Sequence, residues 1–532
     1  MRDGGLLLWA MVPVLPFLVV GRPVDGLGVA WDLLWIALLA SWWVGRRLPA
    51  VERPGWLISL ALGGLWALVL TYSLALAGSR AATDEQLPLY DLTLLVRPLV
   101  VVAADLYGAV IYAVALGAAL LPLVFVVLGA AGARGVLPVR RPAVWVGVAA
   151  LLVLAPGSRA LTWDLGADAV RSWRLAAAFD AERAARPHDD LQRLELSADP
   201  ARRPDVHVYV VESYGTVVRR LQGAKLWEQS LERLQEEAKD QGWSTAAGVS
   251  TAPVHGGRSW ISDTSVLTGL HVATQSNYER ATAMADRIPT LPRFFQDRGY
   301  TTILVRPSDR ARPGVKLQNR FHFQRTVFFD DLEYTGPAMG WGHIPDQYTL
   351  YVAHRDVIDP LPGPTFAFFH LATSHMPWFL RPKRLDDPLA ILDQEGKREQ
   401  ILKIRKAGQE LRMQAKRFTS DDGLKKTIDR TKEQGNYVAS VIYDIESVVQ
   451  QVGGPDGARP RLVVFYGDHQ PPFLARGEPP TVPVHVMASD PAMLEPFLEA
   501  GFRPGLLPQR YTPVVEHRDL FPLIARAAAA SR

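Results

Sequence analysis

The sequence predicts two parts of different fold class, an N-terminal α-helical transmembrane bundle and a C-terminal α/β domain with a mostly parallel central sheet. The segment 1–158 is largely apolar and carries few charges, whereas the remainder is charged. In that remainder, apolar runs alternate with helical patterns, which is typical of parallel strands joined by crossover helices. We expect a membrane domain over 1–158, a juxtamembrane helix and linker over 159–205, and an extracytoplasmic domain over 206–532.

Composition excludes several classes of site and partner. The 532 residues include no cysteine, which excludes disulfides, cysteine nucleophiles and thiolate metal sites. The formal net charge of +4 is small for this length, so we expect no nucleic-acid partner.

The membrane domain is predicted from apolar segments near the length of about 20 residues that a bilayer requires. Five segments qualify, over 6–21, 29–45, 55–78, 104–130 and 143–158. Two ionisable residues, Asp32 and Asp105, lie in apolar surroundings, and we favour a structural role for both.

The loops predict the orientation of these spans. Basic residues follow the second and fourth spans, which places those loops in the cytoplasm. They are Arg46, Arg47, Arg53, Arg134, Arg140 and Arg141. Five spans then leave the C-terminal domain outside the cytoplasm, and an even number would reverse this. We expect a multi-pass protein of a bacterial-type cell membrane, in contact with the lipid bilayer.

Within the C-terminal domain, short apolar runs predict the strands. They cover 207–211, 301–305, 366–372, 462–466 and 482–488. Helical spacing is present over 217–240 and 436–450, and 393–417 is predicted as a solvated helix.

Reactive side chains follow several of these strands. Asp468 and His469 come directly after 462–466, and a carboxylate beside an imidazole at a strand end is a natural pair of metal ligands. The alternative is a turn with an Asp cap and a solvated histidine. Glu212 ends the first strand in the same way, and its alternative role is a charge at a helix N-terminus.

Two further segments carry candidate residues. In HGGRSWISDTSVLTGL (255–270), two glycines precede Ser259 at a predicted helix start, where the helix dipole favours phosphate and a deprotonated hydroxyl. An ordinary helix cap is the alternative. His375 follows the strand at 366–372 and either contacts a phosphoryl oxygen or is a loop histidine bonded to backbone. Trp341 lines a pocket or fills an apolar gap.

Together these segments resemble the lipoteichoic acid synthase-like branch of the alkaline phosphatase and sulfatase superfamily. The matching motifs, in order, are VYVVESYG (208–215), GGRSWISDTSVLTGL (256–270), LQNRFHFQRTVFFDD (317–331), WGHIPDQ (341–347), ATSHMPW (372–378) and YGDHQPP (466–472). The resemblance covers about 206–525, and five membrane spans ahead of an outside enzyme domain also match. It implies an alkaline phosphatase/sulfatase-like fold.

The resemblance also implies a site. In the family, a glutamate, a hydroxyl nucleophile and an Asp-His pair bind one divalent metal ion, which carries over to Glu212, Ser259, Asp468 and His469. The family nucleophile is usually Thr, so Thr251 and Ser262 are kept as alternatives to Ser259. Mn, Mg and Zn all suit such ligands. The family's substrate contacts carry over to His375, Trp341 and Arg320.

The implied function is a membrane-anchored, metal-dependent phosphotransferase. It would move a phospholipid head group, such as glycerol phosphate, from a phospholipid or other phosphodiester donor through a phosphoserine intermediate to an envelope glycan or lipid acceptor. The alternative is a hydrolase, acting as a phosphodiesterase or on sulfuric esters. Formylglycine sulfatases need Cys/Ser-x-Pro-x-Arg, which is not present around Ser259. A non-catalytic envelope scaffold is a third hypothesis, and phosphoethanolamine transferases usually carry disulfides, which this chain cannot form.

Overall fold

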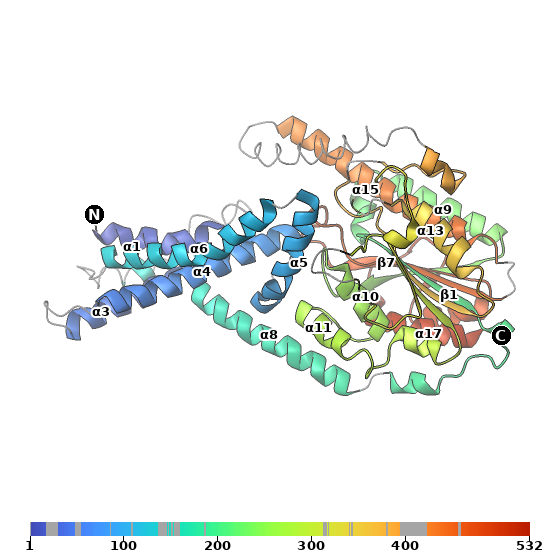
Figure 1. The fold of residues 1–532 in the computed structure, drawn as a ribbon, viewed down its shortest axis with the longest axis horizontal. Helices are drawn as coiled ribbons and strands as arrows, with labels where there is room; N and C mark the ends of the chain where they lie inside the picture. Colours follow the sequence, from blue (N-terminus) through green and yellow to red (C-terminus); the bar gives the residue numbers. More distant parts are fainter. Residues whose placement is uncertain are drawn as a thin grey trace. The chain divides into compact units, whose positions relative to one another are not determined.

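In the computed structural model the chain forms two compact units (Figure 1). The helical unit comprises Met1–Ala178 with Thr274–Ser276, and the sheet unit comprises Phe179–Ala273 with Asn277–Arg532. The residues that the structure describes are 2–16, 30–47, 55–83, 85, 87–107, 110–136, 146, 148–150, 153, 160–185, 188–311, 317, 319–339, 341, 344–378, 381–393, 423–455 and 459–531.

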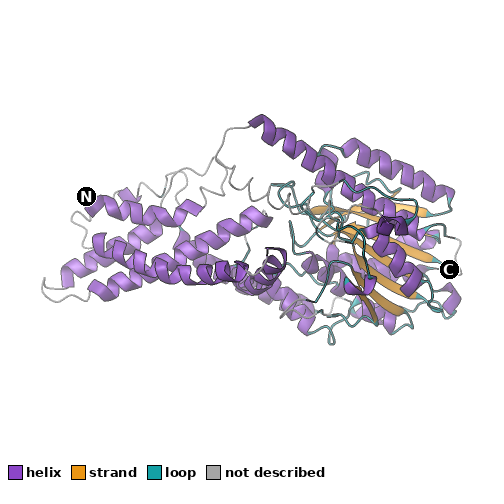
Figure 2. Cartoon of the chain, turned by 45° about the horizontal axis from the view of Figure 1, so that its top comes forward, coloured by secondary structure: helices purple, strands orange, loops and turns teal. Residues whose placement is uncertain are grey.

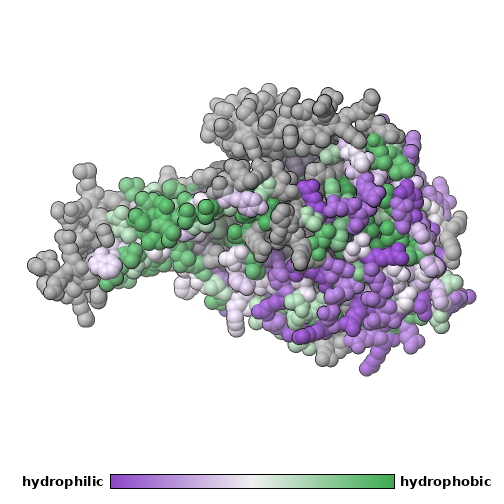
Figure 3. All heavy atoms as spheres, viewed as in Figure 1, coloured by the Kyte–Doolittle hydropathy of each residue, from purple (hydrophilic) through white to green (hydrophobic). Residues whose placement is uncertain are grey.

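The helical unit contains long apolar helices. The helices are α1 (Arg2–Met11), α3 (Trp31–Arg47), α4 (Gly55–Thr83), α5 (Leu89–Tyr107), α6 (Val110–Val136) and α8 (Leu161–Ala184), whose last turns belong to the sheet unit. Among the described residues, two stretches are long and apolar enough to cross a membrane, Trp56–Arg80 and Ala115–Ala133. They lie within the third and fourth predicted spans, allowing for helix ends. Figure 3 shows hydrophobic residues over much of this unit's visible surface.

The count of five spans stays a prediction. α1 covers part of the first span, and α3 covers most of the second. Most of 143–158 lies outside the described residues, as do 17–29, Arg53, Arg140 and Arg141. The side chain of Asp105 is also outside that description.

Close packing of α4 on α6 depends on glycine. A Cβ on Gly63 would lie 2.5 Å from the backbone nitrogen of Ala130 and 2.7 Å from the backbone oxygen of Val126. A Cβ on Gly129 would lie 3.0 Å from the Cα of Gly63. The two backbones therefore touch, which is how small residues allow helices to associate in lipid.

Asp32 has a structural role, as the sequence suggested. Its Oδ2 accepts hydrogen bonds from the backbone N–H of Thr162 at 2.7 Å and of Trp163 at 3.0 Å. These donors lie in the first turn of α8, where N–H groups have no partner within the helix. Asp32 therefore caps α8 from a distant part of the sequence.

The sheet unit is built on a nine-stranded sheet. Its strands are β1 (Asp205–Val211), β2 (Ser244–Thr251), β3 (Thr301–Arg306), β4 (Arg325–Phe328), β5 (Thr365–His370), β6 (Arg461–Gly467), β7 (Thr481–Ala488), β8 (Arg503–Pro504) and β9 (Val515–Glu516). The order is β4-β3-β5-β1-β6-β7-β2-β8, and β9 pairs with β2. The run from β4 to β6 is parallel, and β7 pairs antiparallel with β6 and β2.

The five predicted strands are all present, and the prediction of a mostly parallel sheet is confirmed. Four strands were not predicted: β2, whose sequence STAAGVST lacks a strongly apolar run, and the short β4, β8 and β9. β2 is nevertheless buried, because its small residues fit between neighbouring strands and Phe502. A Cβ on Gly248 would lie 2.9 Å from that ring.

Helices cover both faces of the sheet (Figure 2). One core contains side chains of α9 (Ala224–Asp240), α13 (Asp346–Ala353) and α15 (Gly423–Val452). The other contains side chains of α12 (Leu291–Gln296), α16 (Glu495–Glu499) and α17 (Leu520–Ala530). β1 contributes alternate residues to the two cores, as the pleat of a strand requires. The predicted helix 393–417 lies almost wholly outside the described residues.

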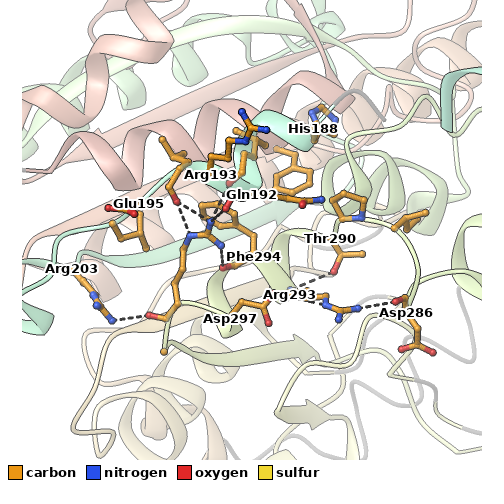
Figure 4. Close-up of a pocket in the computed structure, with 18 of the residues that line it drawn as sticks. His188, Gln192, Arg193, Glu195, Arg203, Asp286, Thr290, Arg293, Phe294 and Asp297 are labelled. Carbon is orange, nitrogen blue, oxygen red and sulfur yellow. Dashed lines mark hydrogen bonds and ion pairs between the residues drawn. The ribbon is translucent and has the colours of Figure 1, made fainter. Parts of the chain in front are cut away.

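The segment 188–203, predicted as linker, is bound to the sheet unit. The guanidinium of Arg298 donates to the backbone oxygens of Leu191, Gln192 and Leu194 at 2.8 to 3.1 Å. Arg203 donates to the backbone oxygen of Arg298 at 2.7 Å. These contacts border a cavity of about 1050 Å³ whose charged lining residues are shown in Figure 4. Because arginine donors satisfy its backbone oxygens, this segment is part of the folded unit.

Candidate metal centre and nucleophile

Three neighbouring parallel strands end in reactive side chains. β1 lies between β5 and β6, with Val210 opposite His370 and Val211 opposite Gly467. Glu212 and Asp468 each follow the last residue of their strand, and His370 is the last residue of β5. The carboxyl ends of parallel strands meet at one edge of a sheet, where ligands bind in open α/β folds. The topology therefore brings these side chains together.

Glycine allows the turn that carries Asp468. A Cβ on Gly467 would lie 1.8 Å from the backbone oxygen of Tyr214, so no larger residue fits there. The chain after β1 thereby passes directly over the end of β6. This approach lets the backbone N–H of Ser213 donate to Asp468 Oδ1 at 2.7 Å.

Ser259 is the first residue of α10 (Ser259–Thr268) and faces this edge. Its Oγ lies 2.8 Å from Glu212 Oε2 and 3.3 Å from His469 Nε2. Arg258, at the N-cap, adopts the left-handed conformation, with φ of 64°. The backbone N–H of Gln470 donates to the backbone oxygen of His255 at 2.9 Å, which ties the loop before α10 to the segment after β6.

His469 is held in a defined tautomer. Its Nδ1 lies 2.9 Å from the backbone oxygen of Gln470, and because a carbonyl only accepts, Nδ1 carries the hydrogen. Burial lowers the pKa of His469 to about 4, so the ring is neutral and Nε2 presents a lone pair. That atom lies 3.2 Å from Asp468 Oδ2 and 3.5 Å from Glu212 Oε1.

The donor set fits a divalent cation. Asp468 Oδ1 accepts two backbone N–H groups, but its Oδ2 is buried without a hydrogen-bond partner. Burial and the nearby charge of Glu212 raise the pKa of Asp468 well above its usual range. Oxygen and imidazole donors from Glu212, Asp468, His469 and Ser259 converge on one region. A cation bound there would offset the cost of burying two carboxylates side by side.

Glu212 remains ionised in this setting. Burial alone would raise the pKa of Glu212, but the electrostatic effect of His375 and the hydrogen bond from His370 hold it well below its usual range. The hydroxyl of Ser213 donates to its Oε1 at 2.8 Å. The hydroxyl of Ser374 donates to its backbone oxygen at 2.6 Å. Both its side chain and its backbone are therefore fixed.

His370 is a further polar residue at this edge that no motif in the sequence indicated. Its Nε2 lies 3.1 Å from Glu212 Oε2, and its Nδ1 lies 3.0 Å from Asp263 Oδ2. One ligand atom each from Glu212, His370 and Asp468 lie within 4.8 Å of one another. Its position in the sequence was the available clue. His370 is the last residue of an apolar strand, and Glu212 and Asp468 directly follow the last residues of β1 and β6.

The two alternative nucleophiles have other contacts. The hydroxyl of Ser262 donates to the backbone oxygen of Asp468 at 2.6 Å, so it stabilises the turn after β6. Thr251 ends β2 opposite Thr481 and Glu516. Among the described residues, Ser259 is the one of the three whose hydroxyl bonds to Glu212.

The candidate substrate contacts fall into two groups. The rings of Trp341 and His375 stack with centroids 4.9 Å apart, and Nδ1 of His375 contacts the backbone oxygen of Met376, as the alternative of a loop histidine bonded to backbone expects. Arg320 instead contacts α11 (Gln275–Ala283), where its Nη1 lies 3.1 Å from Thr282 Oγ1 and 3.4 Å from Glu279 Oε2. The structure thus brings His375 and Trp341 together and gives Arg320 partners of its own.

A sequence model of the sulfatase family, described as "Sulfatase", matches residues 238–530, which is more than half of the chain. The chain belongs to the sulfatase family. No curated protein matches the sequence.

Several solved structures are similar to the chain at low sequence identity. The lipoteichoic acid synthase LtaP from Listeria monocytogenes is 14% identical with a TM-score of 0.37, covering 64% of this chain and 77% of that one. The integral membrane lipooligosaccharide phosphoethanolamine transferase A from Neisseria meningitidis is 12% identical with a TM-score of 0.44, covering 98% and 97%. The Streptococcus pyogenes phosphoglycerol transferase GacH, in complex with sn-glycerol-1-phosphate, is 14% identical with a TM-score of 0.34, covering 66% and 83%.

Proposed function

We propose that this sulfatase-family chain is a membrane-anchored phosphotransferase of the lipoteichoic acid synthase-like branch. The carrying observation is the placement of Ser259 Oγ between Glu212 Oε2 and His469 Nε2, next to the unpartnered Oδ2 of Asp468. Glu212, Ser259, Asp468 and His469 would hold one divalent ion, Mn, Mg or Zn. When bound, such an ion lowers the pKa of a hydroxyl and neutralises charge on a phosphoryl group.

The reaction is a double displacement at phosphorus. The oxygen of Ser259 forms a bond to the phosphorus of a phospholipid head group, and the bond from phosphorus to the lipid alcohol breaks. Ser259 loses its hydroxyl proton as it attacks, and the alcohol leaves with the electron pair and takes up a proton. An acceptor hydroxyl on an envelope glycan or lipid then attacks the phosphoserine, releases Ser259 and loses its own proton.

His375 and Trp341 are proposed to contact the donor head group. Their rings stack, and the residue before His375, Ser374, donates from its hydroxyl to the backbone oxygen of Glu212, which supports closeness to the site. Arg320 is a weaker candidate, because its guanidinium already contacts Glu279 and Thr282. The membrane spans would hold the sheet unit outside the cytoplasm, near lipid substrate.

A hydrolase is the second candidate, because the matching family model is that of sulfatases. Water would then replace the acceptor hydroxyl. Cleavage of sulfuric esters through formylglycine is disfavoured, since Ser259 is followed by Trp260, Ile261 and Ser262 rather than by x-Pro-x-Arg.

The test compares Ser259→Ala with Ser265→Ala in the full chain, reconstituted with Mn²⁺. Ser265 is a buried serine of the same helix that bonds to backbone within its own region. Donors are phosphatidylglycerol, phosphatidylethanolamine and an aryl sulfate. We expect Ser259→Ala to lower head-group release on the order of 10³-fold or more, and Ser265→Ala to keep it. Full activity in Ser259→Ala would reject the assignment, and cleavage of the aryl sulfate alone would favour the hydrolase.

A further inference from the structure

The two histidines at the strand ends differ in what their ring nitrogens contact. In His469, one nitrogen bonds to a backbone carbonyl, which leaves Nε2 free to present a lone pair. In His370, both nitrogens face carboxylate oxygens, Glu212 Oε2 at 3.1 Å and Asp263 Oδ2 at 3.0 Å. Each ring nitrogen of His370 therefore has a carboxylate partner within hydrogen-bond distance. Its Nε2 contacts the same Glu212 oxygen that contacts Ser259, so neither nitrogen is left without a partner to face a metal ion.

Asp263 joins His370 to Arg306. It lies one helical turn after Ser259 in α10, and its buried Oδ2 forms an ion pair with Nη2 of the partly buried Arg306 at the end of β3. Arg306 Nη1 also lies 3.4 Å from Asp309 Oδ2. Arg306, Asp263, His370 and Glu212 thus form a row in which basic and acidic side chains alternate and each contacts the next.

The last contact of this row is with Glu212 Oε2, the oxygen that also contacts the hydroxyl of Ser259. Glu212 Oε2 receives hydrogen bonds from both His370 and Ser259, whereas Oε1 accepts from Ser213 and faces His469. The Glu212 side chain is 5% exposed, and that of Asp263 is 2% exposed, so solvent cannot substitute for these partners. The position of Glu212 beside Ser259 therefore depends on His370.

We propose that His370 is a positioning residue and not a metal ligand, and that with Asp263 and Arg306 it fixes Glu212 for metal binding and for the reaction of Ser259. This inference rests on the proposed function and goes beyond it by separating the roles of the two histidines. Outer partners of metal ligands typically change metal affinity or activity by about 10- to 100-fold when they are removed.

The test counts imidazoles on the metal. The full chain is loaded with Mn²⁺, and pulsed electron paramagnetic resonance measures ¹⁴N coupling in wild type, His370→Ala, His370→Gln and His469→Ala. We expect coupling from one imidazole in wild type and in both His370 variants, and none in His469→Ala. His207→Gln is the control, because His207 is a buried histidine of β1 that bonds to Thr365 and not to Glu212.

Kinetics supply the second readout. We expect His370→Ala to lower kcat for head-group transfer by about 10- to 100-fold with KM within about twofold, and His370→Gln to recover part of the loss because its amide N–H₂ can donate to Glu212. Asp263→Asn should add little to His370→Gln, because both act on Glu212 through the same contact.

Loss of the ¹⁴N coupling in the His370 variants, or unchanged kcat in them, overturns the proposal. If wild type binds no Mn²⁺, or if Ser259→Ala keeps full transfer, the proposed function fails and the inference fails with it. Because wild type and Ser259→Ala report on the function and the His370 variants on the inference, the two failures are distinguishable.

Discussion

Two pairs of buried carboxyl groups in the sheet unit have different neighbours. Glu212 and Asp468 face a serine hydroxyl and the neutral ring of His469, and Oδ2 of Asp468 has no hydrogen-bond donor. Asp346 and Asp444 instead accept backbone N–H groups of one loop, and no histidine or hydroxyl nucleophile is among those donors. Both pairs are buried and acidic. The residues that contact each pair therefore distinguish the candidate metal centre from the structural pair.

The second pair supports the loop that carries His375. The backbone N–H groups of Ala372 and Thr373 donate to Asp346, and that of Ser374 donates to Asp444. Burial raises the pKa of Asp444 well above its usual range, and the charge of Asp346 raises it further. The raised pKa favours the protonated form of Asp444 beside Asp346.

Removal of one charge from each pair gives the largest expected contrast. Asp468→Asn should lower Mn²⁺ affinity by at least about 100-fold, because a direct ligand is lost and outer partners alone are worth up to that much. Asp346→Asn should leave Mn²⁺ affinity within about tenfold. Titration of the full chain with Mn²⁺ against a competing chelator checks both, and equal losses in the two variants would show that the pairs do not differ in this way.

The two members of the second pair should differ in how much their substitution lowers the free energy of unfolding. Asp346→Asn places an amide N–H₂ against backbone donors and should lower the free energy of unfolding by about 2 kcal/mol, within the range for a buried unsatisfied donor. Asp444→Asn should cost much less at neutral pH, because its amide can donate to Asp346 and accept from Ser374. Thermal unfolding followed by near-UV circular dichroism measures both variants, and a larger loss in Asp444→Asn would contradict the assignment of the proton.

The proton on Asp444 also predicts a pH dependence. The folded pKa lies above the unfolded value of about 3.9. The folded state therefore holds a proton that the unfolded state has released, and stability from this group falls as pH rises through the folded pKa. The Asp444→Asn variant has no carboxyl group to titrate at this position. We therefore compare the free energy of unfolding of wild type with that of the variant, and expect wild type to lose stability relative to the variant from pH 5 to pH 8. A difference that stays constant or increases would show that Asp444 is ionised.

The smallest expected effect concerns Arg320. Its ion pair with Glu279 joins partly exposed side chains, 31% and 44% exposed, and such pairs are worth about 0 to 1 kcal/mol. Arg320→Ala should change kcat/KM for head-group transfer by less than about threefold, whereas His375→Ala should lower it by more than about tenfold. A loss in Arg320→Ala as large as that in His375→Ala would restore Arg320 as a substrate contact.

Sequence alone predicts the strand ends better than their mutual contacts. Apolar runs that stop at Glu212 and Asp468 mark the edge of the sheet, and the parallel order then brings both residues together. Ser259 follows from the glycine-rich turn and the helix after it. Such local patterns are readable because backbone geometry and burial impose them on a few adjacent residues.

The missed features depend on distant parts of the chain. His370 looked like the end of an apolar strand, and its role becomes visible only when Asp263 and Arg306 lie beside it. Asp346 and Asp444 lie in two helices, far apart in sequence. β2 is held by antiparallel neighbours rather than by its own hydrophobicity. No local pattern encodes these contacts.

The central claim is tested most directly by isolating a phosphorylated peptide. The full chain, loaded with Mn²⁺ and turning over phosphatidylglycerol without acceptor, is quenched with acid, digested and analysed by mass spectrometry. We expect a glycerophosphoryl group on Ser259 in wild type and on no residue in Ser259→Ala. A head group bound instead to Ser262 or Thr251, or turnover with no adduct at any time after mixing, would contradict the account.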